Sequence, residues 1–391
     1  MDVLRTLIEP RHRKNIDWLL VLAILLLMGT SLLTIYSAMT GQKGASAGLQ
    51  FTVKQGVSYL SGLLLMAYIA TRDYSVIRRS TTLLYWGNIA LLLVVRLLGH
   101  QDIGGAVTKG SARWIPLAFG FRLQPSELAK VCLILTLAVF LAQVGPRIRE
   151  LPVFLKTLAH VGLPMFLIKM QPDLGTALVV AAIWFGMVYL AGADWRHLTA
   201  IALAGVALFT LAWKTGIGMD KYQRDRIEVL FWSDEYKKSL PPKERDKAYQ
   251  MDQGLAAVGG GQVTGQGYRH GLQTSGGFVP ENWTDFAFSA LAEELGFVGG
   301  IWVLAVYLLL LARGLFCIVE SEDALGRLIV GGVVTYLGFH VFVNVAMNCG
   351  IAPVVGVPLP LMSYGGSSAW TSCIALGLIL SVRMRRRKLQ F

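Results

Sequence analysis

Long apolar segments recur along nearly the whole chain, each close to the roughly 20 residues that cross the hydrocarbon core of a bilayer as a helix. Polar, basic or glycine-rich stretches separate them. The pattern predicts ten transmembrane helices, at residues 17–37, 53–71, 81–98, 126–143, 153–170, 174–191, 197–215, 286–312, 328–350 and 364–382. The expected fold class is therefore all-α, with one polytopic membrane domain over residues 1–391.

Lysines and arginines in the short loops orient these spans, because cytoplasmic loops carry an excess of positive charge. The residues that decide the orientation are Arg5, Arg11, Arg13, Lys14, Arg72, Arg78, Arg79, Arg147, Arg149, Arg196, Arg313, Arg327, Arg383, Arg385, Arg386, Arg387 and Lys388. Placing all of them in the cytoplasm puts both termini inside. The segments 99–125 and 216–285 are then extracytoplasmic.

The amino-acid composition also indicates a protein that lies in a membrane. Only 15% of the 391 residues are charged, whereas a soluble domain carries about 25%. The net charge of +12 sits in basic clusters between the apolar runs, as membrane topology requires, so no nucleic-acid partner is expected.

The longer outer segment, 216–285, has about 70 residues. Loops of this length are usually functional or disordered. Pro241-Pro242 predicts the start of a helix from Lys243 to Ala257, which the glycines at 259–261 end. Aromatic residues and glycine turns continue through the remainder, so an ordered loop is expected.

Polar residues gather at the outer, N-terminal ends of the even-numbered spans. They are Gln124, Pro125, Ser126, Glu127 and Lys130 at span four, Gln171, Pro172 and Asp173 at span six, Pro280, Glu281, Thr284 and Asp285 at span eight, and Pro360, Ser363, Tyr364, Gly365, Gly366, Ser367 and Ser368 at span ten. Such residues are ordinary helix-start signals. Helix N-termini also carry partial positive charge, so several converging ends would form an anion site.

Charged residues within the spans need a partner or a function. Glu127 and Lys130 lie three residues apart on one helix face, either as a structural ion pair or as a pair that presents the lysine to a phosphate. Asp285 stands where the long loop enters the membrane and is either a helix cap or a general base. Glu293 is assigned a supporting role near Asp285.

Cations and an aromatic ring on the outer side complete the candidates. Arg113-Trp114 pairs a cation with a flat ring near the headgroups, although interfacial tryptophans commonly serve only as anchors. Lys221, Arg224, Arg226 and Arg269 are surplus positive charge outside. Such charge suits an anionic lipid substrate.

Five motifs in order resemble those of the SEDS family. They are Gly110-Ser111-Ala112-Arg113-Trp114-Ile115, Gln124-Pro125-Ser126-Glu127-Leu128-Ala129-Lys130, Gln171-Pro172-Asp173-Leu174-Gly175-Thr176-Ala177, residues 280–286 followed by Ala292-Glu293-Glu294-Leu295-Gly296-Phe297, and residues 358–368. The resemblance covers nearly the whole chain. The short N-terminus and the residues of the span-eight motif resemble the RodA branch, which acts in cell elongation, more than the FtsW branch, which acts in cell division.

The resemblance implies a ten-helix, GT-C-like peptidoglycan glycosyltransferase that acts on lipid II. It also implies a class B penicillin-binding protein as crosslinking partner, with other membrane proteins of the elongation machinery. Asp285 matches the family's essential catalytic residue, and Glu127, Lys130 and Trp114 match functionally important positions. Many relatives read Glu-Ala-His-Thr-Asp where this chain has Glu281-Asn282-Trp283-Thr284-Asp285. The missing histidine leaves Asp285 as the candidate base.

The expected site thus has one catalytic residue, a substrate-binding group and a supporting group. Substrate binding is assigned to Lys130, Glu127, Arg113, Trp114, Arg224, Arg226, Asp173, Ser363 and Ser367, and support to Thr284, Glu281 and Glu293. A divalent cation, Mg²⁺ or Mn²⁺, is a further candidate for stabilising pyrophosphate, although the sequence shows no dedicated cage for it.

Two rival functions differ in what they require. A lipid II flippase would need a polar path open to the inside and inverted repeats, neither of which the sequence shows. A non-catalytic scaffold that activates a partner synthase would tolerate replacement of Asp285.

Overall fold

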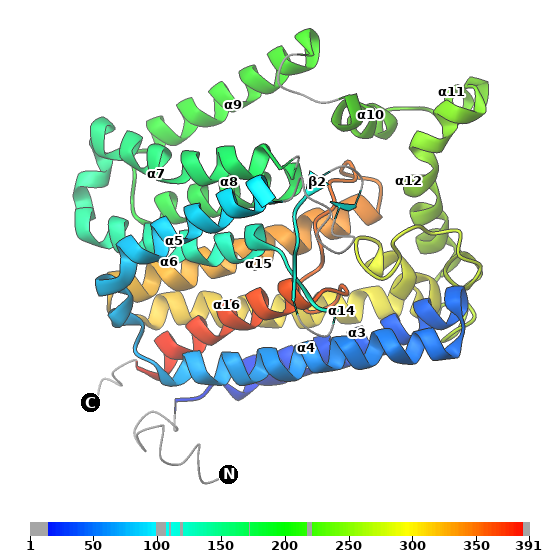
Figure 1. Cartoon of the computed structure of the whole chain (residues 1–391), viewed down its shortest axis with the longest axis horizontal. Helices are drawn as coiled ribbons and strands as arrows, with labels where there is room; N and C mark the ends of the chain where they lie inside the picture. Colours follow the sequence, from blue (N-terminus) through cyan, green and yellow to red (C-terminus); the bar gives the residue numbers. More distant parts are fainter. Residues whose placement is uncertain are drawn as a thin grey trace.

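The computed structural model describes residues 15–98, 107–108, 111–117, 120–171, 173–216 and 221–385. Long helices lie roughly side by side in it as a bundle (Figure 1). They are α3 (Trp18–Lys43), α4 (Ala45–Thr71), α5 (Ile77–Leu98), α6 (Pro125–Val144), α7 (Leu151–Lys169), α8 (Leu174–Leu190), α9 (Trp195–Thr215), α14 (Ala287–Glu320), α15 (Ala324–Asn348) and α16 (Gly366–Met384). Each overlaps one predicted span, which confirms the all-α fold class.

Most of these helices suit a bilayer. In the described part of the chain, 8 helical segments are long and apolar enough to cross a membrane. Helix α8 is a shorter apolar helix of 17 residues, and α4, with 27 residues, lies outside the set of 8. The chain is therefore an integral membrane protein, while the count of ten spans stays a prediction.

Local sequence signals explain several helix ends. Asp17 caps α3 by accepting a hydrogen bond from Leu20 N at 3.2 Å, and Asp323 caps α15 in the same way. Pro125 is the first residue of α6, a position where its missing N–H costs nothing. These signals therefore mark where α3, α6 and α15 begin.

Helix α16 lies at the centre of the bundle and α9 at its edge. Nearly all of α16 is buried, and it packs against α4, α6, α14 and α15. In α9 only Leu198 is buried, and the helix stands away from the others in Figure 1. The candidate residues that precede α16 therefore belong to the best-packed part of the structure.

The long loop is ordered in its described residues. It contains α10 (Lys221–Leu230), α11 (Asp234–Ser239), α12 (Pro242–Gly260) and α13 (Leu272–Ser275). The helix predicted at 243–257 is confirmed as α12. Two small antiparallel hairpins precede α6, pairing β1 (Val107–Thr108) with β2 (Ser111–Ala112) and β3 (Ile115–Pro116) with β4 (Arg122–Leu123).

Helix α14 is broken at Gly296, where φ is +67°. The break frees backbone groups that pair with the loop: Phe297 N donates to Gln262 O at 2.8 Å, Val298 N to Val263 O at 3.2 Å, Gln266 N to Glu293 O at 2.9 Å and Gly267 N to Glu294 O at 3.0 Å. Buried backbone groups require such partners. A Cβ atom on Gly296 would lie 2.3 Å from Gly265 N, so the loop can dock here only against glycine.

The two ends of the bundle differ. The start of α3 and the end of α16 lie at one end, and α10, α11 and α12 lie at the other (Figure 1). Gly110, Pro172 and the basic residues before 15 and after 385 lie outside the described residues.

Candidate active site

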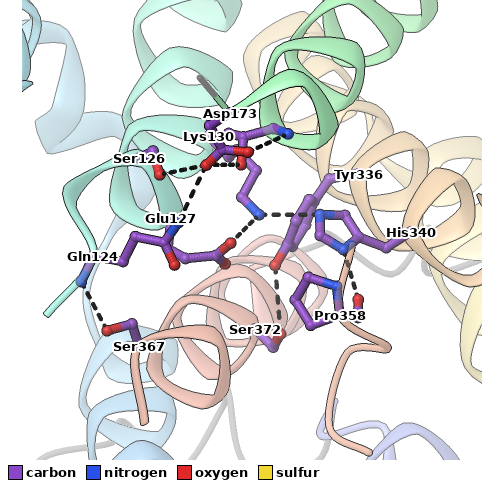
Figure 2. Close-up of polar contacts among 11 residues, drawn as sticks. Gln124, Ser126, Glu127, Lys130, Asp173, Tyr336, His340, Pro358, Ser367 and Ser372 are labelled. Atoms are coloured by element: carbon purple, nitrogen blue, oxygen red, sulfur yellow. Dashed lines mark hydrogen bonds and ion pairs between the residues drawn. The ribbon is translucent and has the colours of Figure 1, made fainter. Parts of the chain in front are cut away.

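Three of the polar N-terminal ends are joined directly. Gln124, before α6, donates its backbone N–H to Ser367 Oγ at 2.9 Å, and Ser367 Oγ donates to Arg122 O at 2.8 Å. Asp173, the N-cap of α8, accepts hydrogen bonds from Gln124 Nε2 at 3.2 Å and from Ser126 Oγ at 3.3 Å. The starts of α6, α8 and α16 therefore form one cluster (Figure 2).

The fourth end, that of α14, is attached through the loop before α16. Ser363 Oγ donates to Thr284 O, and Tyr364 N donates to Trp283 O at 2.7 Å. Thr284 Oγ1 also donates to Glu281 Oε2 at 3.0 Å. The four ends are therefore brought together, because each is linked to another by hydrogen bonds.

Glu127 and Lys130 form the buried centre of this region. Lys130 Nζ lies 2.7 Å from Glu127 Oε1 and 3.0 Å from His340 Nε2, and 5.0 Å from the centroid of the Tyr336 ring. Figure 2 shows the ammonium enclosed among these side chains. Lys130 is 0% exposed, and its three N–H donors all face protein. A contact with substrate phosphate, as predicted for Lys130, would require an accessible ammonium, which this arrangement does not provide.

The contacts of His340 define its tautomer. The Lys130 ammonium can only donate, so Nε2 accepts and the ring proton lies on Nδ1. Nδ1 then donates to Pro358 O at 2.9 Å. The Glu127–Lys130 pair is thereby connected to the 356–358 segment, which lies beside Asp285.

The carboxylate of Asp285 and the guanidinium of Arg226 face the same small space. A Cβ atom built on Gly356 would lie 3.4 Å from Asp285 Oδ2 and 4.0 Å from Arg226 Nη1. Gly356 has φ +72°, and Arg226 is held over it by donating to Val354 O at 2.6 Å. An acid and a cation therefore lie side by side at a point where the backbone has no side chain.

The main chain of Asp285 is held by two buried amides of α15. Asn344 Nδ2 and Asn348 Nδ2 each donate to Asp285 O at 3.0 Å. With His340 they occupy successive turns of one helix face, and all three are at most 1% exposed. Sequence reasoning missed them. Their spacing of four residues within an apolar span is the signal that identifies them.

The remaining predicted residues lie around these two clusters. Arg113 Nε donates to Gln171 O at 2.8 Å, and Trp114 is half-buried beside it in sequence. Arg224 stacks over the Trp213 ring at 5.8 Å, facing the end of α9.

Glu293 is buried against the loop. Its carboxylate accepts from Gln273 N at 2.6 Å and from Thr274 N at 2.8 Å, at the start of α13. Glu293 therefore anchors the loop at α13, whereas the sequence assigned it a supporting role near Asp285.

No group of three or more His, Cys, Asp and Glu side chains that could hold a metal ion occurs among the described residues. The side chains that face Gly356 are one carboxylate and one guanidinium, and a guanidinium cannot ligate a cation, so these two groups alone do not form a cation cage. Mg²⁺ is commonly held by one or two carboxylates together with substrate phosphates. A cation at Asp285 would therefore have to arrive with the substrate.

The fold and site define a class: polytopic membrane proteins with a carboxylate and cations gathered at one end of a helical bundle. The profile of the FtsW/RodA/SpoVE family, described as a cell cycle protein family, matches residues 17–388. The chain belongs to this family.

Named relatives are similar along nearly their whole length. The peptidoglycan glycosyltransferase MrdB of Escherichia coli K12 is 34% identical over 96% of this chain and 95% of its own. The peptidoglycan glycosyltransferase RodA of Treponema pallidum is 33% identical, over 96% and 99%. The probable peptidoglycan glycosyltransferase FtsW of Geobacter sp. M18 is 32% identical, over 96% and 99%.

Solved structures share the fold. A chain of a peptidoglycan synthase complex that coordinates polymerisation and crosslinking superposes with a TM-score of 0.74 at 29% identity, covering 94% of this chain and 97% of that one. The rod shape determining protein RodA of Thermus thermophilus gives 0.67 at 27% identity, over 95% and 98%.

Proposed function

We propose that the chain is a peptidoglycan glycosyltransferase that polymerises lipid II into β-1,4 glycan strands, with Asp285 as general base. The observation that carries the proposal is that the Asp285 carboxylate and the Arg226 guanidinium face the same space at Gly356. It lies beside four joined helix starts, in a family whose named members are peptidoglycan glycosyltransferases.

The chemistry is a single displacement. Lipid II carries an α-linked sugar pyrophosphate, so a β-linked product requires inversion at the anomeric carbon. Asp285 takes the proton of the acceptor 4-hydroxyl, the acceptor oxygen bonds to that carbon, and the lipid pyrophosphate leaves with the electrons of the broken bond.

Charge developing on the leaving pyrophosphate needs preorganised donors. Arg226 faces the same space at Gly356 as Asp285, and Arg224 and Arg113 add positive charge from α10 and from the segment between β2 and β3. Helix N-termini add partial positive charge. Lys130, Glu127, Asp173, Ser363 and Ser367 support this surface from within, through the contacts described above.

The reaction takes place at the outer face of the bacterial plasma membrane, with both termini in the cytoplasm. The distribution of lysine and arginine supports this orientation. So does the separation of α10–α12 from the start of α3 and the end of α16 at opposite ends of the bundle (Figure 1).

A class B penicillin-binding protein is the proposed crosslinking partner, within the elongation machinery and its other membrane proteins. The structural relative in a complex that coordinates polymerisation and crosslinking supports this pairing. The MrdB and RodA relatives support elongation, whereas the FtsW relative, at 32% identity, makes division the alternative. Mg²⁺ or Mn²⁺ brought by the substrate remains part of the proposal.

The test uses the purified full-length chain in detergent, where no membrane separates two compartments. Lipid II is supplied with the partner's transpeptidase blocked, and the products are separated by length. A polymerase forms glycan strands under these conditions. A flippase or a scaffold leaves lipid II unchanged, and that result would refute the proposal.

A further inference from the structure

We propose that Asn344 and Asn348 are positioning residues for Asp285, holding its main chain outside helix α14 so that its carboxylate faces Gly356. The inference rests on the proposed function and adds to it the residues that set the geometry of the base. It follows from the hydrogen bonds at the junction between the long loop and α14.

Asn348 replaces a hydrogen bond of the helix. In a regular α-helix the N–H of residue 289 would donate to the carbonyl of residue 285. Here Ser289 N donates to Asn348 Oδ1 at 3.0 Å, and Asn348 Nδ2 donates to Asp285 O at 3.0 Å. The side-chain amide is thus inserted between donor and acceptor. It keeps residue 285 out of the helix while leaving both groups satisfied.

The orientation of this amide is determined by its partners. Ser289 offers a backbone N–H and a hydroxyl at 2.6 Å, both on the Oδ1 side. If the Asn348 amide were flipped, its NH2 group would face the backbone N–H of Ser289, and two donors would oppose each other. Its oxygen would then face the carbonyl of Asp285, and two acceptors would oppose each other there. The observed orientation is therefore the one that allows donation to Asp285.

Asn344 links Asp285 to the backbone segment that faces it, at Gly356 and Val357. Its Nδ2 donates to Asp285 O at 3.0 Å and to Val357 O at 2.8 Å. Val357 follows Gly356, the residue that faces the carboxylate. One amide with two hydrogens therefore fixes both the acid and the backbone in front of it.

Neither asparagine needs to touch substrate for this role. Both side chains are 0% exposed, and their hydrogen bonds are with backbone, with Ser289 and with each other, Asn348 Nδ2 donating to Asn344 Oδ1 at 3.2 Å. Loss of one amide would leave the carbonyl of Asp285 with one donor in place of two, so that residues 284–289 could shift toward a regular helix. A misplacement of about 1 Å at a reacting group can cost about 100-fold in rate, so the effect should appear in kcat.

The experiment compares Asn348→Leu, Asn348→Asp and Asn344→Leu with Asn88→Leu in full-length protein. Asn88 is also a buried asparagine, at 5% exposure on α5, and its substitution has the same shape change. Polymerisation of lipid II gives kcat and KM, and thermal melting gives stability. Hydrogen exchange reports the amides of residues 284–292.

We expect each α15 variant to lower kcat by at least about tenfold, with KM changed by less than about threefold, since uniform binding is untouched. Exchange should accelerate in residues 284–292 while the other helices stay protected. Asn348→Asp keeps an acceptor for Ser289 but cannot donate, so it should behave like Asn348→Leu. Asn88→Leu should change kcat by less than about twofold.

Unchanged kcat in the α15 variants, a rise in KM alone, or an equal loss of kcat in Asn88→Leu would overturn the proposal. If Asn348→Leu does not fold, Asn348→Asp and Asn344→Leu carry the test with the same expectations. Asp285→Asn serves as the reference. If it retains full activity, the proposed function fails, whereas the exchange at residues 284–292 still tests the positioning by itself.

Discussion

Breaking the buried Glu127–Lys130 pair should cost more than removing it as a whole. Both side chains are at most 4% exposed, with the charged atoms 2.7 Å apart. Lys130→Met leaves the Glu127 carboxylate without its cation, and Glu127→Gln leaves the ammonium without its anion. Removing one partner of a buried pair typically costs about 3–5 kcal/mol, because the other charge remains uncompensated.

The double variant, Glu127→Gln with Lys130→Met, carries no buried charge at this site. What remains is His340 Nε2, which accepts from Lys130 at 3.0 Å and loses its donor. An unsatisfied buried acceptor costs about 1–3 kcal/mol. The double variant should therefore be destabilised by about 1–3 kcal/mol, well below the sum of the single variants, about 6–10 kcal/mol.

The assay is thermal or denaturant unfolding of the purified wild type, both single variants and the double variant, with polymerisation measured on each. Arg147 and Glu150 provide the control, because they have the same spacing but are exposed, at 71% and 54%, and 3.6 Å apart. Their coupling should be about 0–1 kcal/mol. Additive destabilisation at Glu127 and Lys130 would refute the coupled pair.

Activity separates the two roles of the lysine. Because the Lys130 ammonium is enclosed, polymerisation should return together with stability in the double variant. A stable but inactive double variant would instead show that Lys130 reaches substrate in another conformation, as the sequence alone suggested.

Three further predictions concern the loop and the orientation. Gly296→Ala should destabilise the protein severely, because φ there is +67° and a Cβ would lie 2.3 Å from Gly265 N; melting measures this, and Gly162→Ala, with no heavy atom near its Cβ position, is the control. Glu293→Gln should speed proteolysis within residues 261–275, since the charged acceptor of two backbone N–H groups is lost; an unchanged cleavage rate would contradict the anchoring role. Reporter fusions near residues 110 and 235 should read as extracytoplasmic, and fusions near 76, 148 and 385 as cytoplasmic; a cytoplasmic signal at 235 would place Asp285 at the wrong leaflet.

The apolar pattern was sufficient for the helices, because each span must satisfy its own backbone in lipid. Local signals located α12, which begins at Pro242 and has Gly261 as its C-cap. Parity placed the four polar helix starts on one face of the membrane, and the folded chain brings them together. The break at Gly296 was not predicted, because residues 286–312 were interpreted as one continuous span. Its cause is the docking of a loop from another part of the chain.

The hydrogen-bond partners of the site residues could not be predicted from the sequence for a similar reason. Lys130 and His340 are 210 positions apart, and nothing local indicates that a histidine closes the Glu127–Lys130 cluster. Glu293 looked like a companion of Asp285 because both belong to span eight. Its carboxylate instead points to α13, a direction fixed only by the folded loop. The amides of Asn344 and Asn348 were detectable by spacing, but their acceptor was not.

The most direct test of the account is the rate at which Asp285→Asn polymerises lipid II, compared with wild type at saturating substrate. Asparagine keeps the shape of the side chain and removes its basicity, and loss of a general base costs about 100- to 10,000-fold in rate. The account predicts a fall of at least about 100-fold, with folding and lipid II binding unchanged. A variant that retains more than about a tenth of wild-type activity would contradict it.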